Sequence, residues 1–402
     1  MKLPKIYLAI DNCFASKRWT LPREWLGLVA DFGLTKVEAS SDTEADPLYS
    51  DSDYMLDWRR DVKAAVTEIG VDVVNLYSGH GTYATLGLGH SDRRIRDRMK
   101  NDWIKPMIET AADLGAGVGF YCHGFPQATL QEPRLYEAAR TLLFDSLAEI
   151  AAFGVERGLH AVSVEQMYAP HQIPWTIAGT RELMREVYSR AGAPMYVTVD
   201  TGHAFGQRCF GRPTVSELRK AAENMPEAAT TSSLWLGSEA TRASFVRAAK
   251  EQDLSEREER LMEVVDSMLA HPYLFSENED GDPYAWLSAL GAYSPIVHLQ
   301  QVTKNSSAHE PFTPELNAKG AIDPGKVLQS IAASYESAID PSLPPACESI
   351  FLTLEIFARP EVHPRKLLQQ LADSVRYWRC WVPEDGRRID TLLQSAPKSG
   401  GA

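Results

Sequence analysis

Residues 135–166 read LYEAARTLLFDSLAEIAAFGVERGLHAVSVEQ, a long segment followed by a short apolar run. Within residues 135–158, apolar side chains recur every three or four positions, which predicts an amphipathic helix. Residues 161–166 are apolar or small almost without interruption until Glu165, which is typical of a strand covered on both faces of its sheet. The stretch therefore predicts one helix and one strand of an α/β domain.

The same alternation continues in both directions along the chain. Further strands are predicted at residues 6–11, 36–40, 71–77, 117–123, 195–200, 296–301 and 350–357. Further helices are predicted at residues 21–34, 53–70, 92–115, 180–192, 282–291, 323–336 and 363–381. Eight strands that alternate with helices favour a closed (β/α)₈ TIM barrel, formed by residues 1–402 as a single domain, over an open doubly wound sheet.

The spacing is regular except between the sixth and seventh strands. Residues from about 214 to 274 are highly charged and have helical periodicity, which predicts a helical insertion. Such an insertion could serve as a lid or as a contact in a homo-oligomer, or it could be a solvated helical pair. A C-terminal helical extension is expected after the eighth strand, and residues 390–402 are expected to form a flexible tail.

The composition limits which binding partners and which cellular compartment are expected. The formal net charge of −13 disfavours nucleic acid, because phosphate backbones are bound by clustered Lys and Arg. The five cysteines are scattered without a CxxC pair, which favours reduced thiols and a cytoplasmic location. No apolar stretch approaches the roughly 20 residues of a membrane span, so no membrane partner is expected.

Polar side chains stand at or near the ends of the predicted strands, where a barrel of this kind carries its chemistry. They are Asp11, Glu38, His123, Glu165, Asp200, His298, Gln300 and Glu355. A buried carboxylate costs several kcal/mol unless it is paired or binds a metal. Three carboxylates that meet at one barrel mouth would repel one another unless a divalent cation neutralised them, and oxygen ligands suit Mg²⁺ or Mn²⁺.

Several other residues could contact a substrate. Asp200 opens the sequence DTGH, so His203 could donate to a substrate oxygen while Asp200 binds metal. Lys17, Arg208 and Arg359 follow predicted strands and could hold a phosphate or a carboxylate.

Four segments together resemble a known family. VSVEQ (162–166), VTVDTGH (197–203), HLQ (298–300) with AHEPFTPELN (308–317), and LTLEIF (352–357) are similar to the xylose isomerase-like barrel superfamily of sugar isomerases and epimerases. The resemblance extends to hydroxypyruvate isomerases and ketose 3-epimerases. It implies a divalent metal, Mn or Mg or else Co, held by Glu165, Asp200, Gln300 and Glu355. His298 would then lie behind the metal ligands, and the substrate would meet His203, His309, Glu38 and His123.

The resemblance implies an isomerase or epimerase of a small sugar or sugar phosphate, in which Glu165 and Glu355 move a proton through an enediolate. Three alternatives stay open from the residues alone. They are a dehydratase on the same barrel, an endonuclease-like phosphodiesterase and a sugar-binding protein without catalytic activity. The acidic balance and the few histidines oppose the endonuclease.

Overall fold

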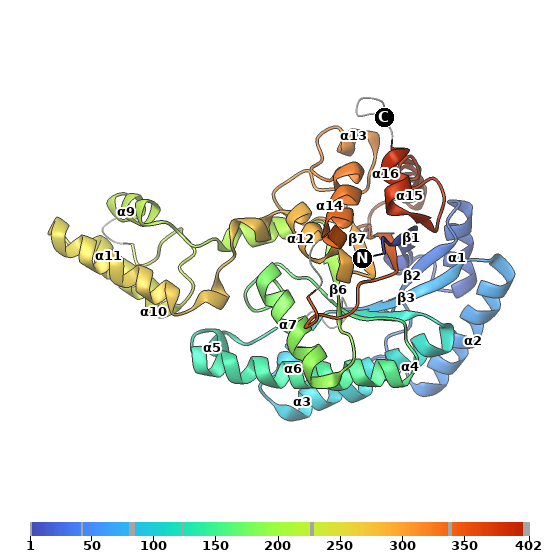
Figure 1. The fold of residues 1–402 in the computed structure, drawn as a ribbon, viewed down its shortest axis with the longest axis horizontal. Coiled ribbons are helices and arrows are strands. Elements are labelled where there is room, and N and C mark those ends of the chain that lie inside the picture. Colours follow the sequence, from blue (N-terminus) through green and yellow to red (C-terminus); the bar gives the residue numbers. More distant parts are fainter. Residues whose placement is uncertain are drawn as a thin grey trace.

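The computed structural model describes residues 2–41, 43–79, 85–122, 124–225, 229–336 and 340–396. Eight parallel strands form a closed barrel with helices around it, which confirms the predicted TIM barrel (Figure 1). The strands are β1 (Lys5–Asp11), β2 (Lys36–Ser40), β3 (Asp72–Ser78), β4 (Gly117–Phe120), β5 (Val162–Glu165), β6 (Tyr196–Asp200), β7 (Ile296–Leu299) and β8 (Ser349–Leu354). Their order follows the chain from β2 to β8, and β1 closes the ring by pairing with both β8 and β2.

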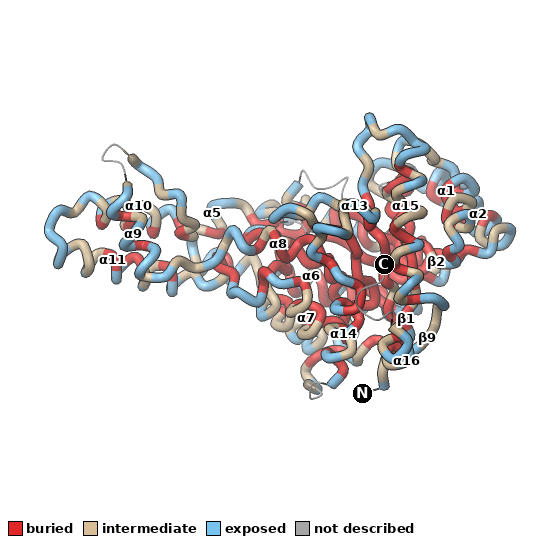
Figure 2. The backbone as a smooth tube through the Cα atoms, turned by 90° about the horizontal axis from the view of Figure 1, so that it is seen from above, coloured by how far each residue is buried: buried red, intermediate tan, exposed pale blue. Residues whose placement is uncertain are grey.

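Helices of very different lengths connect the strands and cover the barrel. They are α1 (Pro22–Asp31), α2 (Ser52–Ile69), α3 (Arg93–Arg98), α4 (Lys105–Leu114), α5 (Gln127–Leu130), α6 (Pro133–Glu156), α7 (Ile177–Ala191), α8 (Ala204–Gln207), α12 (Pro283–Leu290), α13 (Pro314–Asn317) and α14 (Pro324–Glu336). The buried residues gather in the barrel and on the inner faces of these helices (Figure 2). Burial of this apolar area, roughly 25 cal/mol per Å², drives the assembly of the two layers.

The chain after β8 returns to the bottom of the barrel. It forms α15 (Pro364–Arg379), the short strand β9 (Arg387–Arg388), which pairs antiparallel with β1, and α16 (Ile389–Gln394). The first residues of the expected tail are therefore helical and packed, because Leu392 of α16, like Ile389 before it, is fully buried. Residues 397–402 lie outside the described residues.

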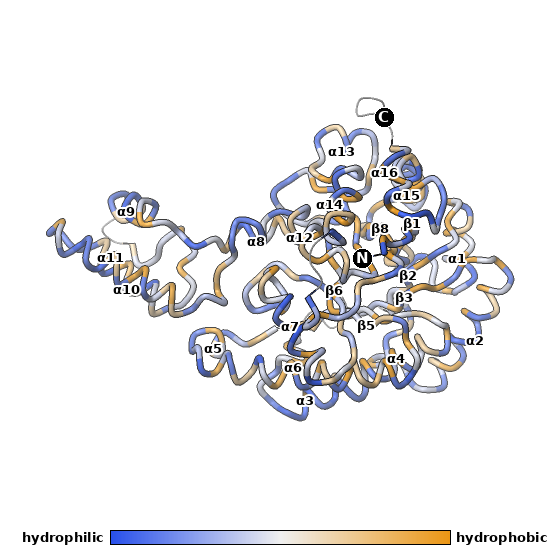
Figure 3. Tube along the Cα trace, in the orientation of Figure 1, coloured by the Kyte–Doolittle hydropathy of each residue, from blue (hydrophilic) through white to orange (hydrophobic). Residues whose placement is uncertain are grey.

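The segment between β6 and β7 contains α9 (Val215–Glu223), α10 (Glu239–Lys250) and α11 (Leu254–Leu269), which project to one side of the barrel (Figure 1). Leu218, Phe245 and Leu261 are fully buried, one from each helix. Hydrophobic positions alternate with hydrophilic ones along these helices (Figure 3). Across the described residues, every helix is too short or too polar to cross a membrane.

Candidate active site

Four acidic or imidazole side chains meet where the barrel strands end. Glu165 is the last residue of β5, Asp200 is the last residue of β6, His298 lies in β7, and Glu355 directly follows β8. One possible ligand atom from each lies within 4.8 Å of those of the other three, and none of the four residues is more than 4% exposed. The strand ends therefore bring three carboxylates and one imidazole into a buried cluster, as the carboxyl ends of barrel strands commonly do.

His298 connects this cluster to a second layer of polar residues. Its Nδ1 lies 3.1 Å from Glu165 Oε1 and 3.3 Å from Glu355 Oε2, while its Nε2 lies 2.8 Å from Glu38 Oε2. Glu38 is itself held by Asn75, whose Nδ2 donates to Glu38 Oε1 over 2.7 Å. When His298 Nε2–H donates to Glu38, the Nδ1 lone pair faces the carboxylates.

The charges in this cluster depend strongly on one another. Burial raises the pKa of Glu355, but the imidazoles of His298 and His309 outweigh burial and bring the pKa well below its usual range. Burial lowers the pKa of His298, but Glu355 and Glu38 raise it well above the ordinary value. Burial is the largest cause of the raised pKa of Asp200. In the protein without metal, the imidazoles therefore supply the positive charge that the carboxylates need.

This donor set fits a divalent cation. Glu355 Oε2 is buried and lacks a well-formed hydrogen bond within the described part of the chain, and its imidazole neighbours His298 and His309 are 3.3 Å away. Carboxylate oxygens with one imidazole nitrogen are common ligands of divalent metals in proteins. Glu165, Asp200, His298 and Glu355 could hold such an ion.

Gln300 lies beside the carboxylate of Asp200, one of the residues of the cluster. Its Nε2 donates to both carboxylate oxygens of Asp200, at 2.9 and 3.0 Å. Its Oε1 accepts from the backbone N–H groups of Ala308 and His309, at 3.1 and 2.7 Å, and from the Ser307 hydroxyl at 3.0 Å. Gln300 therefore lies against Asp200 in the cluster, and its oxygen faces three donors on the loop after β7, so its role as a metal ligand stays a prediction.

The strand register explains why both His298 and Gln300 reach the carboxylates. His298 and Gln300 point to the same side of β7, since side chains alternate along a strand. The Cα of His298 pairs with that of Asp200 on β6, so the imidazole stands level with a carboxylate of the cluster. Neither the register nor the end of β7 at Leu299 can be read from one sequence, so the sequence did not show that His298 contacts the carboxylates directly.

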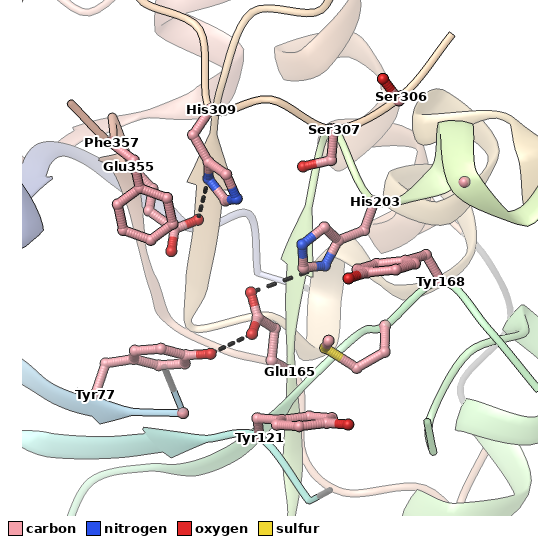
Figure 4. A pocket seen from close by; sticks show the side chains of 13 residues that line it. Tyr77, Tyr121, Glu165, Tyr168, His203, Ser306, Ser307, His309, Glu355 and Phe357 are labelled. Carbon is pink, nitrogen blue, oxygen red and sulfur yellow. Dashed lines mark hydrogen bonds and ion pairs between the residues drawn. The ribbon is translucent and has the colours of Figure 1, made fainter. Parts of the chain in front are cut away.

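The cluster opens into a cavity of about 480 Å³ (Figure 4). The Tyr77 hydroxyl donates to Glu165 Oε2 and fixes that carboxylate. His203 Nδ1 lies 2.6 Å from the backbone carbonyl of Gln166, which leaves its Nε2 as the free nitrogen. The cavity is lined by Tyr77, Gly79, Tyr121, Glu165, Met167, Tyr168, His203, Gly206, Ser306, Ser307, His309, Glu355 and Phe357.

A second cavity, of about 440 Å³, adjoins the first and shares Tyr77, Glu355 and Phe357 with it. Lys17 and Arg359 line this second cavity. The two cavities together bring Glu165, Glu355, His203, His309, Lys17 and Arg359 to one end of the barrel.

Two residues expected to meet the substrate, Glu38 and Arg208, line neither cavity. Glu38 is fully buried behind His298 and lines neither cavity, which corrects the expectation of a direct contact. Arg208 donates to the Gly281 carbonyl at 2.7 Å and packs over the Phe205 ring, so it also lines neither cavity. His123 lies outside the described residues.

Comparisons with known proteins agree with this architecture. Among curated proteins, the D-erythrulose 1-phosphate 3-epimerase of Brucella abortus (strain 2308) is 26% identical over 322 residues, which cover 79% of this chain and 78% of that protein. Among solved structures, a protein of Rhodospirillum rubrum assigned as a xylose isomerase has a TM-score of 0.65 at 18% identity, covering 98% of this chain and all of that one. D-psicose 3-epimerase from Clostridium cellulolyticum H10 has a TM-score of 0.52 at 11% identity, covering 93% of this chain and 98% of that one.

The two solved structures are distant in sequence, and their likeness shows the shared fold. The family model described as xylose isomerase-like TIM barrel matches residues 26–230. This matched segment includes Glu165, Asp200 and His203. The chain belongs to the xylose isomerase-like TIM barrel family.

Proposed function

We propose that this protein is a divalent-metal-dependent isomerase or epimerase of a small sugar or sugar phosphate. The observation that carries the proposal is the pair of carboxylates Glu165 and Glu355, which line one cavity and belong to one potential metal cluster. They come from β5 and β8, which are separated around the barrel by β6 and β7. The 3-epimerase name of the Brucella abortus relative supports the same class of reaction.

A proton next to a carbonyl group is weakly acidic, so its removal needs both a base and stabilisation of the resulting charge. A divalent cation held by Glu165, Asp200, His298 and Glu355 would stabilise the negative charge of the enediolate. Glu165 takes the proton from the carbon, and the electrons of the broken C–H bond move to the carbonyl oxygen. A proton then returns to the same or a neighbouring carbon through Glu355, whose carboxylate can take it from the His309 imidazole 3.3 Å away and pass it on.

The other residues of the cavity orient these groups. Tyr77 holds the carboxylate of Glu165 through its hydroxyl. His203 and His309 face the same cavity and can bind substrate oxygens. His309 is also placed by its backbone N–H bond to Gln300 and by the Phe357 ring, whose centroid lies 4.2 Å from that of the imidazole.

The test is hydrogen exchange in D₂O. Protein loaded with Mn²⁺ is incubated with D-erythrulose, D-erythrulose 1-phosphate, D-psicose and D-tagatose, and NMR follows deuterium at the carbons next to the carbonyl. Exchange is expected with at least one of these ketoses, and it should disappear with a chelator, in Glu165→Gln and in Glu355→Gln. Glu310→Gln is the matched control, because this carboxylate bonds only Thr303 within the described residues and lines neither cavity. Exchange that persists in both glutamate variants would refute the proposal.

A further inference from the structure

The second cavity is built from three loops at the open end of the barrel. One is the turn after β1, which contains the short helix η1 (Asn12–Ala15) and Lys17. Another follows Ser40, the last residue of β2, and carries Thr43. The last is the segment 357–360 after β8. This cavity meets the first one at Tyr77, Glu355 and Phe357. A molecule whose reacting carbons lie between Glu165 and Glu355 can therefore extend into it.

Thr43 carries a buried hydroxyl that needs a partner. The residue is 2% exposed, and its Oγ1 makes no hydrogen bond within the described part of the chain. Since buried hydroxyl groups are nearly always hydrogen-bonded, an unsatisfied one on a residue that lines a cavity points to a bound polar ligand. A phosphate oxygen could accept a hydrogen bond from this hydroxyl.

Lys17 supplies a positive charge at the same cavity. Among the described residues, no carboxylate lies within 4.0 Å of its ammonium group, in contrast to Lys36, Lys63, Lys100 and Lys105, which form ion pairs. Its backbone φ of 62° lies in the left-handed region, where a lysine is less stable than a glycine.

Arg18 and Arg359 add charge to the same wall. The Arg18 guanidinium donates to the backbone carbonyls of Arg359 and Val362, at 2.8 and 3.2 Å, and thereby ties the turn after β1 to the loop after β8. The Arg359 side chain is 85% exposed at the rim.

The two cavities differ in charge. Within the described chain, the first cavity is lined by no lysine or arginine, whereas the second is lined by Lys17, Arg18 and Arg359. Asp11 also lines the second cavity, but it is 1% exposed, and its Oδ1 accepts from the Cys13 backbone N–H at 2.5 Å. An anion is therefore expected at the exposed end, away from Asp11.

We propose that the second cavity is an oxyanion subsite, built by Lys17 and Thr43, that holds the phosphate group of a phosphorylated ketose. The carbonyl end of the same molecule lies in the first cavity between Glu165 and Glu355. This inference rests on the proposed function and narrows its substrate class from sugars in general to sugar phosphates. Charge-assisted hydrogen bonds to a phosphate would provide the preference.

The test uses two variants that remove one group each without opening the fold. Lys17→Gly removes the ammonium and suits the positive φ, so the melting temperature of the free protein should stay the same or rise. Thr43→Val removes the unsatisfied hydroxyl and keeps the shape, so it should not lower the melting temperature either. Lys304→Met is the matched control, because it removes one exposed positive charge after β7 from a residue that lines neither cavity.

Two measurements are made on the full-length, Mn²⁺-loaded protein. The first is the rise in melting temperature with inorganic phosphate, which reports binding by mass action. The second is kcat/KM for exchange with D-erythrulose 1-phosphate and with D-erythrulose. For the phosphorylated ketose, Lys17→Gly should lower kcat/KM by about 10- to 100-fold and Thr43→Val by about 10-fold, as expected for losing bonds to a charged group. Both variants should leave the unphosphorylated ketose unchanged, and Lys304→Met should change neither.

The outcomes separate this inference from the proposed function. Equal exchange with both ketoses, unaffected in Lys17→Gly and Thr43→Val, would overturn the subsite while the proposed function stands. If inorganic phosphate stabilised the wild type but not the variants, and no ketose exchanged, the anion site would be supported and the sugar phosphate substrate overturned. Phosphate stabilisation that is the same in all four proteins would place the anion elsewhere and overturn the proposal.

Discussion

Replacing Glu38 by glutamine tests whether His298 is a metal ligand. Glu38 is fully buried, and its two carboxylate oxygens have different partners, Asn75 Nδ2 at 2.7 Å and His298 Nε2 at 2.8 Å. Glutamine has the same shape but offers one oxygen and one NH₂ group. In Glu38→Gln, one of the two neighbours must therefore face a donor instead of an acceptor.

The expected loss of metal affinity follows from which groups donate and which accept hydrogen bonds around residue 38. Asn75 offers its amide protons to residue 38, so the glutamine oxygen pairs best with Asn75 and the glutamine NH₂ turns to His298. His298 then accepts at Nε2 and carries its proton on Nδ1, the nitrogen that faces Glu165 and Glu355. A protonated Nδ1 cannot bind a metal. Loss of such a supporting partner typically weakens metal binding by about 10- to 100-fold, or ~1.4–2.7 kcal/mol.

The assay is a competition titration of Mn²⁺ against a fluorescent chelator, with circular dichroism and a melting curve to establish that the variant is folded. Glu310→Gln serves as the control, because it makes the same chemical change at a carboxylate bonded to Thr303. The reasoning is refuted if folded Glu38→Gln binds Mn²⁺ as tightly as the wild type. In that case His298 either does not bind the metal or does not depend on Glu38 for its tautomer.

Three further predictions concern single side chains. Asp385→Asn should lower the free energy of unfolding at pH 7 by ~1.5–3 kcal/mol, because Asp385 accepts two bonds from Arg379. Burial raises the pKa of Asp385, but the bonds from Arg379 outweigh burial, so the pKa is lowered in the folded protein. The difference in free energy of unfolding between wild type and variant, measured by denaturant titration, should therefore be complete above about pH 4 and disappear as the pH falls through the folded pKa. Tyr77→Phe should reduce kcat for exchange about 10-fold with little change in KM, since the hydroxyl orients Glu165. An unchanged kcat would contradict that role. Gly27→Ala, inside α1, should raise the free energy of unfolding by up to ~1 kcal/mol, because no atom lies within 4 Å of the added Cβ; a loss of stability would show hidden crowding.

The sequence by itself determined the architecture of the barrel. Alternating apolar strands and amphipathic helices predict a parallel sheet covered by helices, and eight such units favour a sheet that closes into a barrel. It also placed Glu165, Asp200 and Glu355 at strand ends, because a carboxylate within or after an apolar strand can be recognised in the sequence. These features depend on local periodicity, which a single sequence contains in full.

Only the tertiary structure decided which side chains face one another. His298 and Gln300 share one side of β7, and both reach the cluster: the imidazole lies beside Glu165 and Glu355, and the amide donates to Asp200. Glu38 interrupts an apolar strand as Glu165 does, yet it lies in the middle of β2 and contacts His298 and Asn75 behind the cluster. Thr43 and Lys17 share a cavity although they lie on separate loops. Such contacts depend on strand register and loop path, which are set by packing across the whole barrel and not by neighbours in the chain.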